Sequence, residues 1–382
     1  MLDRWSVLIS GFAASIGLML AIDHLPRLVR PELGENRVLA SLPAFPNNVA
    51  NLRAYPKKID AYVIDNFPAR PYFISALNYL RYKAGYSGTS RILVGSDGWL
   101  FYDDGGHLDQ ARDAAPLSAK QRQAWVTTLA GRVDQLRSMN AVYVVLSAPV
   151  KELIYPEKVP RWARKGHGDA ELLEADARSV SYPNLLGLRS TLIKERQTHP
   201  DIYTRYESHW TGHGARSAYV ALCERLTELG FAIEPTPASD FSFTDIHAKD
   251  LARMLGISSL IQPYFPRFQH PIQAKLKETY LSQTGGPNRP HIIETGLAGK
   301  PTLQITADSF GGELLNFLYP HFSRLIVSHP QDGFYREDLI STYHPDVVIL
   351  EVVEFGLRHA MSPAADPGLT GRDRIRDHFR RQ

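Results

Sequence analysis

The sequence has 382 residues, which is enough for one large domain or two modest ones, and its 44% hydrophobic and 22% charged residues are ordinary for a globular protein. The net charge of +3 is too small to indicate nucleic acid as a partner, although it is compatible with an anionic ligand. The single cysteine, Cys223, excludes an internal disulfide, and its apolar neighbours predict a buried structural thiol.

The N-terminal segment is strongly apolar. Residues 5–22 carry no charge, and as a helix they would span about 27 Å, close to the hydrocarbon thickness of a membrane. Because no clear cleavage site follows, we expect residues 1–22 to be a membrane anchor or an uncleaved signal, with the body of the chain outside the cytoplasm. A helix buried in a soluble protein is the alternative.

The next segment is rich in proline and turn-forming residues. Residues 23–60 predict a stalk or an extended wrapping segment. Residues 58–83 have apolar positions at helical spacing, interrupted by Pro68 and Pro71. Residues 90–106 read as a strand, a Ser-Asp-Gly turn and a second, aromatic strand.

The rest of the chain alternates between helical and strand patterns. Strands are expected at 141–149, 301–307, 323–328 and 346–353, and helices at 117–140 (capped by Ser118), 167–178, 185–197, 212–229, 245–256 and 311–321. Residues 266–297 look like an irregular hairpin insertion, and the basic tail 371–382 reads as a solvated face or an interaction patch. This alternation predicts an α/β fold with a mostly parallel sheet flanked by helices.

Ser309 lies two residues after a predicted strand and shortly before a predicted helix. Such a turn exposes a serine hydroxyl, and the free N–H groups of the helix can stabilise an oxyanion. Gly311 and Gly312 would let the backbone approach a substrate closely. The alternative is that Asp308 or Ser309 only caps the helix.

A serine nucleophile needs a base and a group that orients the base. Glu207 and His209 are two residues apart, so in extended backbone they project to the same side, and the carboxylate could bind one imidazole nitrogen. A surface Glu with a packed His is the plainer interpretation, and His213 is a competing base. Trp210 could stack on a sugar or belong to the core.

Several motifs occur together in one order: "GENRVLASLPAFP" (34–46), "RILVGSDGWLFY" (91–102), "LSAPVKELIYPEKVP" (146–160), "YESHWTGHGA" (206–215), "DLARMLG" (250–256) and "ADSFGG" (307–312). They resemble the AlgJ/AlgX-like family of alginate O-acetyltransferases, over roughly residues 30–355. The resemblance implies a variant SGNH hydrolase fold, which we expect at 86–382, after a stalk and wrapping segment at 23–85. It also implies Ser309 as nucleophile, His209 as base and Glu207 as the triad carboxylate, where the family carries aspartate.

The resemblance further implies an activity. Ser309 would accept an acetyl group from a membrane-bound acyltransferase partner and pass it to an exopolysaccharide such as alginate, in the periplasm, with the chain held at the inner membrane by its N-terminal helix. Trp210 and Lys151 are candidate polysaccharide contacts, although Lys151 could simply lie on the surface. Neither a cofactor nor a metal is expected. A polysaccharide acetylesterase with the same triad and a non-catalytic polysaccharide-binding component are the alternatives.

Overall fold

The centre of the molecule is a seven-stranded sheet in the order β4–β3–β11–β9–β10–β8–β7. The computed structural model describes residues 4–24, 29–34, 38–103, 117–163, 168–283 and 286–362. The strands are β3 (Val142–Ala148), β4 (Leu185–Gly187), β7 (Lys277–Tyr280), β8 (His291–Glu294), β9 (Thr302–Ala307), β10 (Arg324–Ser328) and β11 (Val347–Val353). The first five in the spatial order are parallel, and β8 and β7 add an antiparallel edge.

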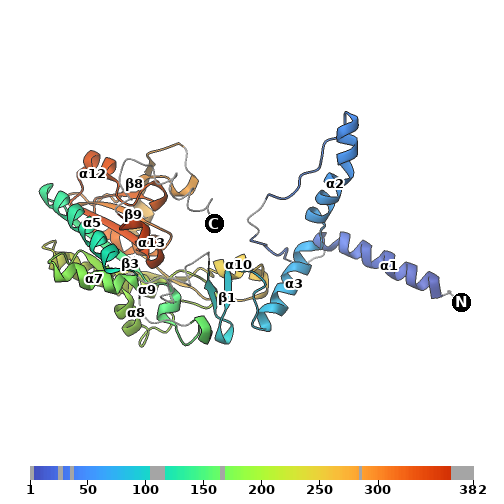
Figure 1. The fold of residues 1–382 in the computed structure, drawn as a ribbon, viewed down its shortest axis with the longest axis horizontal. Coiled ribbons are helices and arrows are strands. Elements are labelled where there is room, and N and C mark those ends of the chain that lie inside the picture. The colour runs from blue at the N-terminus through green and yellow to red at the C-terminus, as the bar shows by residue number, and fades with distance from the viewer. Residues whose placement is uncertain are drawn as a thin grey trace.

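Helices cover both faces of this sheet (Figure 1). They are α5 (Ala119–Ser138), α7 (Asp169–Ser179), α8 (Arg189–Glu195), α9 (Gly212–Glu228), α11 (Gly311–Leu318), α12 (Glu337–Tyr343) and α13 (Glu354–Ala360). Alternate residues of β3 point to opposite faces. Val144 and Leu146 pack with α9 and α11, whereas Tyr143 and Val145 pack with α5 and α7. The predicted α/β architecture with a mostly parallel sheet is therefore confirmed.

Two sequence predictions differ from the structure. Residues 185–197 were expected to form one helix, but Leu185–Gly187 is strand β4, paired with β3, and the helix α8 begins only at Arg189. The burial of this short apolar run beside β3 outweighs its helical spacing. The hairpin expected at 266–297 is present as the antiparallel pair of β7 and β8, but this pair extends the central sheet and is not a separate insertion. Strand β6 (Pro266–Gln269), in the same range, pairs with β5 (Ser242–Asp245).

The N-terminal region is more helical than the sequence predicted. Part of the expected stalk forms α2 (Val49–Asn66), which has no buried residue, and α3 (Arg70–Lys83) follows with Pro71 in its first turn. Figure 1 shows α1 to α3 extending away from the α/β body. Helix α3 meets that body, because Asn78 Nδ2 donates to the carbonyl oxygen of Leu255 at 2.9 Å.

The segment predicted to cross a membrane forms α1 (Arg4–Leu20). With 17 residues this helix is about 26 Å long, somewhat less than the ~30 Å hydrocarbon core. None of the helices in the described residues combines the length and the apolar character that a membrane crossing requires. The prediction of a membrane-spanning anchor at 1–22 is thus not confirmed. The basic tail predicted at 371–382 lies outside the described residues.

The parallel strands bring distant segments together at one edge of the sheet. The carboxyl ends of β3, β11 and β9 are neighbours, so the residues that follow Ala148, Val353 and Ala307 meet there. This edge is where open α/β sheets hold their ligands. The hairpin of β1 (Ile92–Val94) and β2 (Leu100–Tyr102) and the short helix α10 (Asp250–Met254) lie close to it.

Candidate active site

Ser309 is exposed in a turn between β9 and α11, as the sequence predicted. Asp308 fixes this turn: its Oδ1 accepts from the backbone N–H of Phe310 at 2.9 Å, and its Oδ2 accepts from that of Val353 at 2.7 Å. The second bond ties the turn to the end of β11. Asp308 is thus a turn-forming acceptor, and the hydroxyl of Ser309 is presented to solvent.

The two glycines after Phe310 have different surroundings. A Cβ added to Gly311 would lie 2.4 Å from the Cβ of Ala307, a distance that real structures do not tolerate, whereas a Cβ on Gly312 would meet nothing within 4 Å. Gly311 therefore lets the helix start pack tightly against its own strand. Close approach to a substrate, which the sequence suggested for both glycines, is not what Gly311 is needed for.

His209 joins the two other predicted residues. Its Nε2 lies 2.8 Å from Ser309 Oγ, and its Nδ1 lies 2.5 Å from Glu207 Oε1. Glu207 is buried, His209 is partly exposed and Ser309 is exposed. The three side chains form one continuous hydrogen-bonded chain that runs from the interior to the surface, in the geometry of a nucleophile, a base and an orienting carboxylate.

The charges around the imidazole favour its protonated form. Burial alone would lower the pKa of His209, but its hydrogen bond to Glu207 and the nearby charges of Glu207 and Asp250 outweigh burial and raise the pKa above 6.5. Burial would likewise raise the pKa of Glu207, yet the bond to His209 lowers it, so this carboxylate stays ionised. If His209 gains a proton, the ionised Glu207 therefore stabilises the imidazolium.

A second carboxylate, Asp250, supports the first, although no role was predicted for it from the sequence. The backbone N–H of Asp250 donates to Glu207 Oε2 at 2.9 Å, and Asp250 Oδ1 accepts from the backbone N–H of Ser208 at 2.8 Å. The Ser208 hydroxyl also donates to Asp250 Oδ2. Burial and then the charge of Glu207 raise the pKa of Asp250 to about 6. Asp250 is a positioning residue for the Glu207–His209 segment, and its place in the "DLARMLG" motif was the available signal.

Lys151 is not a surface cation. It is 3% exposed, and its ammonium donates to three backbone carbonyls, those of Leu100 (2.7 Å), Arg205 (3.1 Å) and Glu207 (3.1 Å). These three acceptors match the three N–H donors of a lysine. Burial lowers the pKa of Lys151 to about 7. The predicted contact with polysaccharide is therefore wrong: Lys151 fastens the Glu207 loop to strand β2.

Trp210 is fully buried, so it offers no face for stacking on a sugar. Its indole N–H donates to the carbonyl oxygen of Phe310 at 3.0 Å, which links the His209 loop to the Ser309 turn. Of the two interpretations of Trp210, burial in the core is correct, and the predicted contact with substrate is wrong.

The competing base, His213, has different contacts. Its ring stacks on that of His199 with centroids 4.3 Å apart, and its Nε2 lies 3.9 Å from Asp201 Oδ2.

Within the described residues, two groups of side chains have ligand atoms close enough to share a metal ion: His199 with Asp201 and His213, and Glu207 with His209 and Asp250. The atoms of the second group already bond to one another and to the backbone, so they serve the hydrogen-bonded chain.

Cys223, predicted to be a structural thiol, is buried in the core, and burial raises its pKa to about 12. The thiol is therefore not poised as a nucleophile.

A protein-family model matches residues 92–285, about half of the chain, and is described as the SGNH hydrolase-like domain of the acetyltransferase AlgX. The matched span contains Glu207, His209 and Asp250, and Ser309 follows it.

Individual relatives are more distant. A protein of Pseudomonas aeruginosa named "Probable alginate O-acetylase AlgJ" is 24% identical over 220 residues, which cover 56% of this chain and 52% of that protein. The chain thus spans about half the length of this relative. A protein of the same name from Pseudomonas fluorescens is 19% identical over 319 residues, covering 78% of this chain and 77% of that protein.

Among solved structures, PatB1 of Bacillus cereus with a sulfonyl adduct superposes with a TM-score of 0.52 at 13% identity, over 71% of this chain and 96% of that one, which shows a shared fold. The family itself is shown by the match over residues 92–285, and the chain belongs to the AlgX family of SGNH hydrolase-like domains.

Proposed function

We propose that this protein is an O-acetyltransferase that acetylates hydroxyl groups of an exopolysaccharide through an acetyl-serine intermediate. The observation that carries the proposal is the hydrogen-bonded chain from Glu207 through His209 to Ser309, with contacts of 2.5 and 2.8 Å. Membership of a family named for an acetyltransferase, and two relatives named as alginate O-acetylases, support the reaction and the class of acceptor.

In the first half-reaction, Ser309 Oγ attacks the carbonyl carbon of a donor acetyl ester. His209 Nε2 takes the hydroxyl proton as the Oγ–C bond forms, and the ionised Glu207 stabilises the resulting imidazolium. The tetrahedral intermediate collapses when the donor oxygen leaves, and this oxygen takes the proton from His209. The products are acetyl-Ser309 and the free hydroxyl of the donor.

In the second half-reaction, a sugar hydroxyl replaces the donor. His209 Nε2 removes its proton while the sugar oxygen attacks the acetyl carbon, and Ser309 Oγ departs and takes that proton back. The acetyl group is now on the sugar and the enzyme is restored.

The oxyanion of both intermediates needs N–H donors near Ser309. The N–H of Phe310 is bonded to the Asp308 carboxylate, and that of Gly311 donates to the Asp308 carbonyl at 3.1 Å. These two donors are occupied by the turn, so we assign the backbone N–H of Ser309 as the principal donor. The first turn of α11 adds its partial positive charge.

The partners and the location are part of the proposal. A membrane-bound acyltransferase would supply the acetyl group, an exopolysaccharide would accept it, and the chain would work in the periplasm. Alginate is the acceptor named for the relatives, and it is the first polymer to test.

An acetylesterase that uses the same three residues is the second candidate. It is favoured by the exposure of Ser309, because a site open to water permits hydrolysis of the acetyl-enzyme. A degenerate, non-catalytic site fits less well, since the 2.8 Å contact between His209 and Ser309 is within reach for proton transfer.

The test is an acetyl-transfer assay with purified protein, a chromogenic acetyl ester as donor, and alginate or neutral oligosaccharides as acceptors. We expect acetylated oligosaccharide by mass spectrometry with the wild type and none with Ser309→Ala. Acetate release without acetylated sugar would support the esterase instead. Transfer that persists in Ser309→Ala would overturn the nucleophile assignment.

A further inference from the structure

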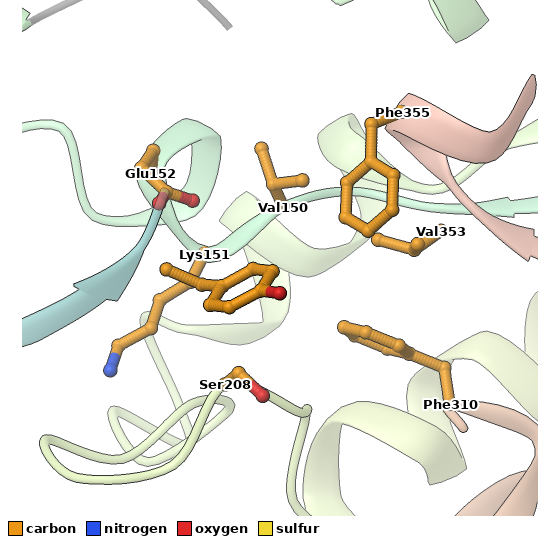
Figure 2. Close-up of a pocket in the computed structure, with 8 residues that line it drawn as sticks. Val150, Lys151, Glu152, Ser208, Phe310, Val353 and Phe355 are labelled. Atoms are coloured by element: carbon orange, nitrogen blue, oxygen red, sulfur yellow. The ribbon is translucent and has the colours of Figure 1, made fainter. Parts of the chain in front are cut away.

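A small cavity lies at the carboxyl ends of β3 and β11, and Figure 2 shows the residues that line it. Its volume is about 40 Å³. It is lined by Tyr102, Val150, Lys151, Glu152, Ser208, Phe310, Val353 and Phe355. Ser309, His209 and Glu207 are not among these residues.

The lining is nevertheless built from the neighbours of the triad. Ser208 directly precedes His209, and Phe310 directly follows Ser309. The ring of Phe310 lies 5.0 Å from that of His209, between centroids. The cavity therefore shares two walls with the candidate active site.

A third wall is fixed to the Ser309 turn as well. The backbone N–H of Val353 donates to Asp308 Oδ2 at 2.7 Å, which bonds the end of β11 to that turn. Figure 2 shows the side chains of Val353, Phe310 and Phe355 grouped on one side of the cavity. The cavity walls and the Ser309 turn are thus bonded to one another at the edge of the sheet.

The chemistry of the walls is mainly apolar. Two valines and two phenylalanines contribute side chains without any polar atom. Lys151 contributes its alkyl stem, because its ammonium is bonded to three carbonyls and, as Figure 2 shows, points away from the phenylalanines. The polar groups of the lining belong to Tyr102, Glu152 and Ser208, and the hydroxyl of Ser208 already donates to Asp250. The valines and phenylalanines form an apolar side that suits a methyl group better than a sugar hydroxyl.

The volume of the cavity also limits which groups it can hold. A site for one water needs about 10–15 Å³, so a cavity of about 40 Å³ holds roughly three water-sized groups. An acetyl group has three heavy atoms besides the ester oxygen, whereas a pyranose ring or a longer acyl chain exceeds the space.

We propose that this cavity receives the acyl group carried by Ser309 and restricts it to acetyl. The inference rests on the proposed function and deepens it, since it names the residues that set the acyl length. Val150 and Phe355 are the walls to alter, because both are partly exposed and both line the cavity from outside the candidate triad. Shortening either side chain enlarges the cavity, so that it admits a longer acyl chain.

The experiment measures kcat/KM for p-nitrophenyl acetate, butyrate and hexanoate, together with formation of the corresponding acyl-enzyme by intact mass. The proteins are the full-length wild type, Phe355→Ala, Val150→Ala and the control Phe73→Ala, which removes an exposed phenylalanine from α3. We expect the wild type to prefer acetate over butyrate by about 10-fold or more. Each cavity variant should reduce that preference to about threefold or less, and Phe73→Ala should keep it.

Equal rates of wild-type acylation with all three esters would overturn the cavity assignment while leaving Ser309 as nucleophile. A preference for acetate that is unchanged in both cavity variants would overturn it as well. If no ester acylates Ser309 in any variant, the proposed function fails, and the cavity assignment fails with it. Val150→Ala removes only two methyl groups, so it keeps the test decisive if Phe355→Ala does not fold.

Discussion

The carboxylate of Glu207 lies 2.5 Å from Nδ1 of His209, although glutamate is one methylene longer than the aspartate of the resembling family. The extra length is accommodated because the loop is held at several points. The carbonyl of Glu207 accepts from Lys151 at 3.1 Å, and its Oε2 accepts from the backbone N–H of Asp250 at 2.9 Å. These contacts hold the Glu207 backbone in place while its longer side chain reaches Nδ1 of His209.

Glu207→Gln should lower kcat for acetyl-ester cleavage by about 100- to 10,000-fold, because the amide neither stabilises the imidazolium nor fixes its tautomer. Glu207→Asp should lose less than this, since it keeps the charge but shortens the reach to Nδ1. Stopped-flow kinetics on the folded variants measures both. An unchanged kcat for Glu207→Gln would assign the orienting role to another residue, with Asp250 the first candidate.

The pH dependence follows from the raised pKa of His209. The imidazole must be neutral to accept the Ser309 proton, so kcat/KM should rise with pH and level off above a midpoint higher than 6.5. Asp250→Asn removes a negative charge that favours the imidazolium, and it should move the midpoint down by up to about one unit. Asp245→Asn, at a carboxylate on β5, should leave the profile in place. A midpoint that rises in Asp250→Asn would contradict the electrostatic account.

Lys151→Met should destabilise the protein, because three carbonyls lose their donor, and those of Leu100 and Glu207 are buried. The expected loss in the free energy of unfolding is about 2 kcal/mol or more. Urea denaturation measures it. The control is Lys158→Met, which breaks the Lys158–Asp97 ion pair at the surface and should cost less than about 1 kcal/mol. Equal losses in the two variants would show that Lys151 is not a clamp.

The adjacent glycines offer a paired test of the Ser309 turn. Gly311→Ala forces a Cβ against Ala307 and should displace the turn, with a large loss of activity and stability. Gly312→Ala meets no atom within 4 Å and sits in a helix, so it should be neutral or stabilising by up to about 1 kcal/mol. Thermal unfolding and ester cleavage distinguish the two. Similar behaviour of both variants would argue against the tight packing described for Gly311.

Much of this arrangement is readable from local sequence. The apolar run at 141–149 predicted β3, and the two-residue spacing of Glu207 and His209 predicted their hydrogen bond. Ser309 was identified by its place between a strand and a helix. These features depend on neighbouring residues, where periodicity and turn chemistry act directly.

The features that the sequence missed depend on contacts across the fold. Asp250 and Glu207, which share a hydrogen bond, are 43 residues apart in the sequence. Lys151 is 51 to 56 residues away from the carbonyls to which it donates. A lysine after a strand looks like a surface cation unless the acceptors that surround it are known. Trp210 has the same ambiguity, since a tryptophan in a polar loop fits a sugar platform as well as a core.

The central claim, that Ser309 carries the acetyl group, is tested most directly by trapping the acyl-enzyme. Wild-type protein is mixed with p-nitrophenyl acetate, quenched in acid within the first turnover, digested and mapped by peptide mass spectrometry, with Ser309→Ala and Ser208→Ala in parallel. The account predicts one added acetyl group on the peptide that contains Ser309 in the wild type and in Ser208→Ala, and none in Ser309→Ala. Acetylation on another residue, or an equal yield in Ser309→Ala, would contradict it.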